Sequence, residues 1–145
     1  MIYTELTCKA MKIAYNAHHE QTDKNGIPYI FHPFHLAEQM TDETSVCAAL
    51  LHDVAEDTDV TIEELEKEFP KAVTDVLILL THDRNEDYFS YISKIKENPT
   101  AKVVKLADLR HNSDISRYTD KSRLSDEKVL LRLKKYEEAI RILNE

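Results

Sequence analysis

The stretch of sequence that decides the fold is residues 48–58, Ala-Ala-Leu-Leu-His-Asp-Val-Ala-Glu-Asp-Thr. It begins as an apolar core helix and ends in four ionisable side chains within six positions, His52, Asp53, Glu56 and Asp57. Because residues four apart lie on one side of a helix, we expect these side chains to gather near the end of that helix. Three carboxylates so close together repel one another, so the pattern indicates a bound cation.

Two further candidate ligands lie on either side of this stretch. His32 precedes it, and Asp108 follows in the apolar helical run of residues 103–112, with Asn112 one turn later. Two imidazoles and two carboxylates form a nitrogen and oxygen set that suits Mn²⁺, Fe²⁺, Co²⁺ or Zn²⁺ better than Ca²⁺. Spacing alone leaves the role of Asp108 open, because a surface aspartate beside a helix-facing asparagine produces the same pattern.

The chain of 145 residues contains a single glycine, Gly26, and no run of alternating Val, Ile and Thr. Walker loops and Rossmann turns each need several glycines for close approach of the backbone to phosphates, so both nucleotide-binding modes are excluded. The shortage of turn glycine favours helices joined by short polar connections. With 42% hydrophobic and 32% charged residues, values typical of globular proteins, we expect one all-α domain over residues 1–145.

Helical periodicity and capping signals predict the element boundaries. The first helix is expected at residues 6–21, and the turn formers of residues 22–28 separate it from a short helix that begins at Pro33. Thr61 begins a Thr-Ile-Glu-Glu capping box, and Pro70 is expected to open the next helix. The remaining predicted helices are residues 43–56, 86–97 and 99–116 and a last amphipathic helix capped by Ser125.

Charge and hydropathy exclude several classes of partner. The formal net charge is −8 and no cluster of Lys and Arg is visible, so we expect no nucleic-acid partner. A small phosphorylated substrate stays compatible, because a bound cation and a few local basic side chains reverse the potential inside one pocket. No apolar run reaches about 18 residues, so we expect a cytoplasmic protein without a membrane partner. Cys8 and Cys47 are expected to be free thiols, and the oligomeric state stays open.

Three blocks of the chain resemble the motifs of RelA/SpoT-type hydrolase domains and their small animal counterparts, in the HD superfamily. The blocks are His32-Pro33, residues 49–58, and residues 104–108 with Asn112, in the same order and with the same internal spacings. The similarity runs from Ala17 to the final helix. It implies a compact multi-helix HD-domain bundle and a metal-dependent phosphohydrolase that removes the 3′-pyrophosphate of guanosine 3′,5′-bispyrophosphate.

The resemblance also implies roles for individual residues. Glu56 and Asp57 would position or deprotonate the attacking water, and Asn112 would contact the ribose or a phosphate of the substrate. One metal ion, usually Mn²⁺ in this family, would be bound by His32, His52, Asp53 and Asp108. Four protein ligands leave coordination positions open for water and a phosphate oxygen, which hydrolysis by a Lewis acid requires. The sequence does not divide the proton-transfer role between Glu56 and Asp57.

The chain departs from the family pattern at two places. The family has Arg-Lys-Ser-Gly-Glu-Pro-Tyr where residues 23–29 read Asp-Lys-Asn-Gly-Ile-Pro-Tyr. The family arginine is expected to stack on the guanine base, and Asp23 supplies neither the plane nor the charge for this contact. Lys24 is a substrate-binding candidate that could compensate as a point charge. Arg110 has moved by one position, about 100° around its helix, so it makes a different contact or only faces the surface.

These departures keep three hypotheses of function open. The first is an Mn²⁺-dependent hydrolase of the guanosine alarmone, which would only degrade it, because 145 residues leave no room for a synthetase domain. The second is an HD phosphohydrolase that acts on another nucleotide, such as a 2′- or 3′-phosphorylated dinucleotide or a nucleoside monophosphate. The third is a non-catalytic sensor of nucleotide or metal. Among the other histidines, His35 and His82 are expected at the surface or in packing, His18 near the pocket, and His111 stays open.

Overall fold

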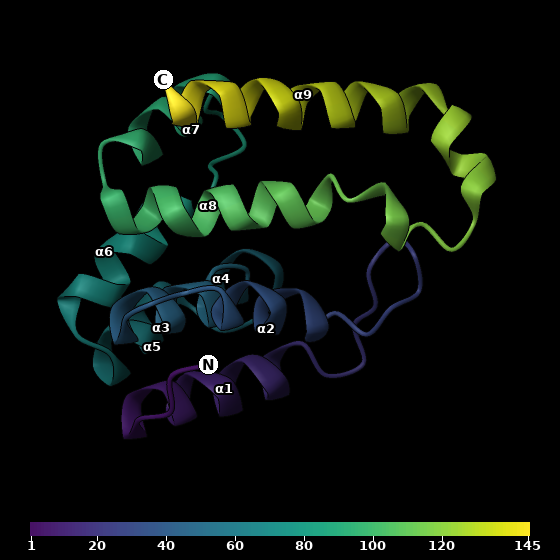
Figure 1. Ribbon diagram of the computed structural model, residues 1–145. Coiled ribbons are helices and arrows are strands. Elements are labelled where there is room, and N and C mark those ends of the chain that lie inside the picture. Colours follow the sequence, from purple (N-terminus) through teal and green to yellow (C-terminus); the bar gives the residue numbers. More distant parts are fainter.

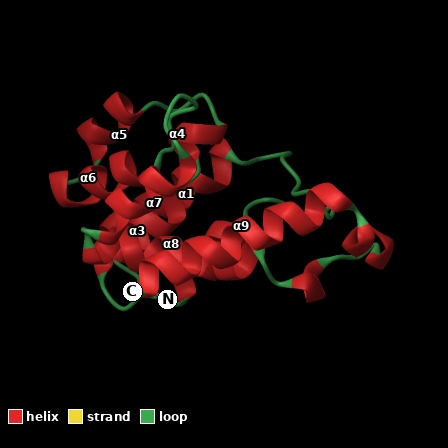
Figure 2. Cartoon of the chain, turned by 90° about the horizontal axis from the view of Figure 1, so that it is seen from above, coloured by secondary structure: helices red, strands yellow, loops and turns green.

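The computed structural model describes residues 1–145 and consists of helices and loops without a strand (Figures 1 and 2). The all-α prediction is therefore confirmed. The α-helices are α1 (Glu5–Ala17), α2 (Phe31–Glu38), α3 (Glu43–Leu51), α4 (Val54–Asp57), α5 (Ile62–Glu68), α6 (Lys71–Leu80), α7 (Tyr88–Lys96), α8 (Pro99–Asn112) and α9 (Glu127–Asn144). Two short 3-10 helices, η1 (Ile115–Arg117) and η2 (Lys121–Ser125), join α8 to α9.

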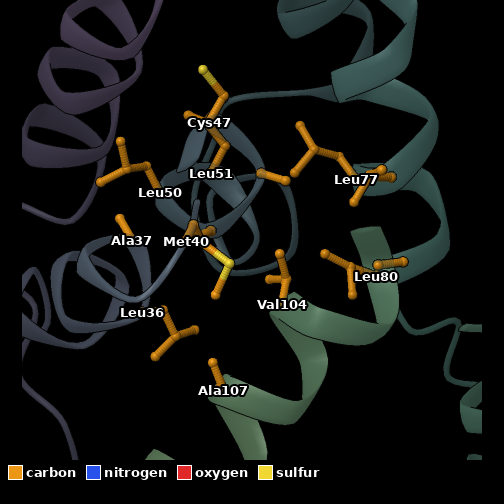
Figure 3. Close-up of a cluster of buried hydrophobic side chains, with 14 of the residues drawn as sticks. Leu36, Ala37, Met40, Cys47, Leu50, Leu51, Leu77, Leu80, Val104 and Ala107 are labelled. Atoms are coloured by element: carbon orange, nitrogen blue, oxygen red, sulfur yellow. The ribbon is translucent and has the colours of Figure 1, made fainter. Parts of the chain in front are cut away.

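Helix α3 is the centre of the core. Every residue from Ser45 to Leu51 is buried, as expected for a helix that is apolar on all sides. Helices α1, α2, α6 and α8 pack around it. Figure 3 shows the contact from within, where side chains of α2, α3, α6 and α8 meet in one apolar cluster. Because α3 leads directly into His52, this core fixes the place at which the ionisable stretch leaves the interior.

The predicted helix over residues 43–56 is interrupted at its functional end, which corrects the expectation of one continuous element. Helix α3 ends at Leu51 and α4 begins at Val54. In a continuous helix the Asp53 amide would bond to the Ala49 carbonyl. That carbonyl instead contacts the His52 Nδ1 at 2.6 Å, a side-chain bond that competes with the helical ladder. Asp53, with φ −101° and ψ −3°, forms the turn between the two helices, and its carbonyl accepts from the Asp57 amide at 2.9 Å.

The first two predicted helices have different boundaries from those expected. Helix α1 stops at Ala17 rather than at residue 21, because Glu20 adopts a positive φ of 70°, which a right-handed helix cannot contain. Helix α2 begins at Phe31, so Pro33 is its third residue rather than its first. Proline is tolerated there because the first turn of a helix has no partner for its amides.

Later boundaries follow side-chain caps that the periodicity did not identify. Helix α7 begins at Tyr88 rather than at residue 86, because the Asp87 carboxylate accepts from the Ser90 amide at 3.0 Å. Helix α8 ends at Asn112 rather than at residue 116, and η1 follows it. The cap of α9 is Asp126, whose carboxylate accepts from the Lys128 amide at 2.8 Å, so the assignment to Ser125 is wrong.

Two other boundary predictions are confirmed. Thr61 caps α5, since its hydroxyl accepts from the Glu64 amide at 3.2 Å, and Pro70 is the residue immediately before α6. Cys8 and Cys47 are both free thiols. None of the helices has the length and apolar character needed to span a bilayer.

The C-terminal third of the chain closes over the loop that follows α1. Helix α9 packs along α7 and α8, and Figure 1 shows η1 and η2 at the far end, next to residues 22–28. Arg123 of η2 donates to the Lys24 carbonyl at 2.7 Å and to the Asn25 side chain at 2.9 Å. Helix η2 and the loop of residues 22–28, almost a hundred residues apart in the sequence, therefore lie side by side.

Candidate functional site

Four side chains from α2, the α3–α4 turn and α8 meet at the centre of the molecule. The Nε2 of His32 lies 2.9 Å from the Asp108 Oδ1 and 3.8 Å from the Asp53 Oδ2. The Nε2 of His52 lies 3.0 Å from the Asp53 Oδ2 and 3.6 Å from the Asp108 Oδ1. Ligand atoms bound to one divalent metal at about 2.0–2.2 Å are separated by comparable distances. The four residues singled out from the sequence are thus brought together.

The donor chemistry of His52 fits a divalent metal. Its Nδ1 is engaged by the Ala49 carbonyl, so in the neutral ring the proton belongs on Nδ1 and the Nε2 carries a lone pair. This Nε2 is buried and has no hydrogen-bond partner, although two carboxylates face it. A buried acceptor without a donor is costly for a protein on its own. An imidazole lone pair that lies among carboxylates offers the ligand atoms to which a divalent cation binds.

The two carboxylates among the ligand candidates are also held by neighbouring side chains. The Tyr29 hydroxyl donates to the Asp53 Oδ2. The Lys105 Nζ donates to the Asp108 Oδ2 at 2.8 Å, and the Asn112 Nδ2 donates to the Asp108 Oδ1 at 2.9 Å. Contacts of this kind orient metal ligands and tune their basicity.

Electrostatics keeps both candidate ligand carboxylates ionised. Burial acts to raise the pKa of Asp108, but the Lys105 ammonium beside it holds this pKa well below its usual value. Burial opposes ionisation at Asp53 as well, yet the positive charge that His52 takes up in the metal-free protein lowers the pKa of Asp53 to about 2. Both groups are therefore carboxylates at neutral pH, as metal ligation requires.

Glu56 and Asp57 of α4 have the opposite electrostatic setting. Burial, and then the neighbouring Asp53 carboxylate, raise the pKa of each above its ordinary value. Carboxylate oxygens of Asp53, Glu56 and Asp57 lie within 4.8 Å of one another. The Glu56 Oε1 accepts from the His82 amide at 3.2 Å. A raised pKa makes a carboxylate a better proton acceptor at neutral pH.

A cleft of about 490 Å³ opens beside the cluster, and most of the residues that line it are polar or charged. Asp57, Asn112 and Tyr29 line it, and each of them also contacts or neighbours the metal-ligand candidates. The other lining residues are Gln21, Thr22, Asp23, Lys24, Asn25, Arg117, Tyr118, Arg132 and Tyr136. Basic and aromatic side chains therefore surround a space that begins at the carboxylates.

Comparison with known proteins identifies the family. A family model described as the HD domain matches residues 10–110. This chain belongs to the HD domain family. The match contains all four metal-ligand candidates, and the expected membership is confirmed.

Curated relatives of this HD domain are longer proteins. It is 35% identical over 116 residues to guanosine-3′,5′-bis(diphosphate) 3′-pyrophosphohydrolase of Aquifex aeolicus, a match that covers 72% of this chain and 17% of that protein. It is 34% identical over 119 residues to the bifunctional (p)ppGpp synthase/hydrolase SpoT of Escherichia coli, covering 72% of this chain and 17% of SpoT. The chain thus spans less than a fifth of the length of these relatives.

A solved structure resembles the HD domain over nearly its whole length. It is that of a metazoan ortholog of SpoT, described as hydrolysing ppGpp and playing a role in starvation responses. The TM-score is 0.72 and the identity 27%, over 97% of this chain and 88% of that one. The shared fold therefore extends beyond residue 110 and includes α9, whose Arg132 and Tyr136 face the cleft.

Asp23 does not present a free carboxylate to the cleft of the HD domain. Its Oδ2 accepts from the Arg117 Nη2 at 2.8 Å. Its Oδ1 accepts from the amides of Asn25 and Ile27, at 2.8 and 3.0 Å. The charge is thus neutralised by Arg117, and the side chain organises its own loop. Sequence distance hid this pair, because 94 residues separate the two partners.

The remaining candidates have distinct placements. Lys24 lines the cleft near Arg132 and Arg123; burial and then these two cations lower its pKa. Arg110 is exposed and lies outside the cleft lining, so it faces the surface and does not make a different contact in the site. His18 is buried, and its Nδ1 lies 2.9 Å from the Gln21 Oε1.

Four residues that lie close to the site were not predicted from the sequence. Lys105 lies in the motif block of residues 104–108, where a lysine one turn before the aspartate of an apolar helix could have indicated it, and Tyr29 ends the stretch of residues 23–29. Arg117 and Arg132 gave no local signal, because only the return of η1 and α9 brings them to the cleft.

Proposed function

We propose that this HD domain is a divalent-metal-dependent hydrolase of guanosine 3′,5′-bis(diphosphate), which takes up one water and yields pyrophosphate and GDP. The observation that carries the proposal is the buried His52 Nε2, which faces two ionised carboxylates without a hydrogen-bond partner. The names of the relatives from Aquifex aeolicus and of the metazoan SpoT ortholog support the choice of substrate.

His32, His52, Asp53 and Asp108 are the proposed ligands, with Mn²⁺ as the proposed ion. Two imidazoles and two carboxylates suit an ion of this class. When bound, the ion supplies Lewis acidity toward a phosphate oxygen and lowers the pKa of a water. Lys105 and Tyr29 hold the ligand carboxylates in place.

Glu56 and Asp57 are the proposed catalytic carboxylates, and their surroundings suggest a division of labour. Asp57 lines the cleft, so we assign to it the proton released by the attacking water. Glu56 lies outside the cleft lining and has one oxygen engaged by the His82 amide, so we assign to it the orientation of that water. Both roles are helped by pKa values above those of exposed carboxylates.

The cleft supplies the contacts for a phosphorylated nucleotide. In a chain of net charge −8, Lys24 and Arg132 bring positive charge to one space, beside the Arg117–Asp23 ion pair. Tyr29, Tyr118 and Tyr136 offer aromatic faces for a base or ribose. Asn112 donates one amide proton to Asp108 and has the second available for the substrate.

A second substrate remains in competition, and a specific observation favours it. The Arg117 guanidinium is held by Asp23 and by the His111 carbonyl at 2.8 Å each, so its donors are partly used before any base arrives. The contact that the family arginine makes with guanine is therefore not reproduced by a free side chain. Another phosphorylated nucleotide, such as a 2′- or 3′-phosphorylated dinucleotide, is the alternative.

Product analysis tests both substrates and the catalytic pair. The purified chain, loaded with Mn²⁺, is incubated with a panel of phosphorylated nucleotides that includes ppGpp, and pyrophosphate and phosphate release are measured. We expect pyrophosphate and GDP from ppGpp. Glu56→Gln combined with Asp57→Asn should keep the bound metal and lose about 10²–10⁴-fold in turnover. Near-normal turnover in that double variant contradicts the roles, and cleavage of a different nucleotide alone selects the alternative.

A further inference from the structure

The rings of His32 and His111 meet end to end. Their Nδ1 atoms lie 2.7 Å apart, their planes differ by 11° and their centroids are 5.0 Å apart. The difference between these two distances equals about one ring radius for each imidazole, so the two ring centres and the two Nδ1 atoms lie almost on one line. The two imidazoles therefore lie nearly in one plane and point their Nδ1 atoms at each other, which is the geometry of a hydrogen bond and not of face-to-face stacking.

A hydrogen bond between two ring nitrogens contains one proton, so its position determines what the other end of His32 offers. If the His111 Nδ1 carries the proton, neutral His32 has its own proton on Nε2, which then donates to the Asp108 Oδ1 at 2.9 Å. If the His32 Nδ1 carries it, the His32 Nε2 presents a lone pair to the carboxylates. Only the second arrangement can bind a metal.

We propose that His111 is a positioning residue whose Nδ1 accepts the His32 Nδ1–H and so directs the His32 Nε2 lone pair toward the ion. His32 has no other partner at this nitrogen. Metal-binding histidines usually give their second N–H to a carboxylate, a carbonyl or water, as His52 does with the Ala49 carbonyl. The His111 Nδ1 is an acceptor only when the proton of that ring is on Nε2, so the ligand state of His32 depends on the tautomer of His111. The inference rests on the proposed metal centre and not on its substrate.

The surroundings of His111 hold its ring in this position. It lies beside Asn112 at the end of α8, and its carbonyl accepts from the Arg117 Nη1 at 2.8 Å. The ring also packs against His35, with centroids 4.3 Å apart and planes that differ by 32°. His35 touches His111 without a hydrogen bond to any ligand candidate, so it provides a control for ring packing alone.

Titration of the metal-stripped full chain with Mn²⁺ by calorimetry tests the proposal. His111→Phe keeps a planar ring and removes the acceptor, and we expect it to weaken Mn²⁺ binding by about 10–100-fold. His111→Asn places an amide oxygen near the position of Nδ1 and should recover most of the affinity. His35→Phe should bind Mn²⁺ as the parent does.

Parental affinity in His111→Phe overturns the proposal, as do equal losses in His111→Phe and His111→Asn, since these indicate packing rather than proton acceptance. A parent that binds no Mn²⁺ overturns the metal centre as well, which separates the two failures. A second measurement needs no variant: nitrogen NMR of the Zn²⁺-loaded parent with labelled histidine. We expect the His32 proton on Nδ1, and a proton on Nε2 overturns the proposal.

Discussion

Lys105 illustrates how one side chain sets the charge of the whole cluster. Its ammonium donates to the Asp108 Oδ2, while the Oδ1 of the same carboxylate faces His32 and His52. Burial acts to lower the pKa of Lys105, but Asp108 raises it well above its usual value, so the charge is retained. The only lysine that touches a ligand candidate thus offsets part of the repulsion among the carboxylates, independently of any metal.

Removing this charge should destabilise the metal-free fold. The Lys105 side chain is 14% exposed and that of Asp108 7%. Breaking a buried pair leaves an uncompensated charge, so we expect Lys105→Met to lower the free energy of unfolding by up to about 3–5 kcal/mol. Urea unfolding in the presence of EDTA measures the loss.

A surface pair provides the matched control for this lysine. Lys71 is 85% exposed and pairs with Asp75, so Lys71→Met should cost only about 0–1 kcal/mol. Similar small losses in both variants would show that the Lys105 pair contributes no more than a surface ion pair.

At the scale of elements, short side-chain contacts decide where helices stop. The His52 ring occupies the Ala49 carbonyl and ends α3. Helix α4 begins anew at Val54, and the carboxylates of Asp53, Glu56 and Asp57 lie within 4.8 Å of one another at its start. The same competition between side chain and backbone operates at the start of α9.

The cap of α9 can be tested directly. The Asp126 carboxylate accepts from the Lys128 amide, whereas the Ser125 hydroxyl donates to the Ser122 carbonyl at 2.8 Å. We expect Asp126→Ala to lower the free energy of unfolding by about 0.5–2 kcal/mol, the cost of a lost N-cap. Ser125→Ala, an exposed neighbour, should change it much less. Urea unfolding of both variants is the measurement, and the reverse order would restore the assignment to Ser125.

At the scale of the whole molecule, the cluster joins parts of the chain that no local interaction connects. Its ligand candidates lie on α2, in the α3–α4 turn and on α8, and they extend along the sequence from His32 to Asp108. Helix α9 and η1 then add Arg132 and Arg117 to the cleft beside it. A ligand that binds this assembly and not the unfolded chain must therefore stabilise the fold as a unit.

Metal loading should raise the thermal stability of the parent protein. At a free metal concentration 100 times the Kd, the gain in unfolding free energy is about 2.7 kcal/mol. Asp53→Ala should remove both the gain and the bound metal. Asp59→Ala, which removes an exposed carboxylate nearby, should retain both. Thermal unfolding with EDTA or Mn²⁺, combined with elemental analysis, checks this, and full metal occupancy in Asp53→Ala would refute the ligand assignment.

The sequence by itself determined the fold class, the family and the chemical character of the site. The single glycine and the helical periodicity excluded sheet folds and glycine-rich phosphate loops, because those need residues that the chain lacks. The run from Leu50 to Asp57 placed polar groups at the end of an apolar core helix, a costly pattern that only a site explains. These properties depend on residue types and on their spacing along the chain, so the sequence alone predicts them.

Tertiary structure alone decided which distant groups act on that site. The Asp23–Arg117 pair, the His32–His111 contact and the approach of Arg132 each join elements far apart in the chain. The break after Leu51 also escaped prediction, because it depends on the direction of the His52 ring, whose Nδ1 contacts the Ala49 carbonyl. Such contacts depend on the directions in which packed helices present their side chains, and periodicity reports only which face of a helix is buried.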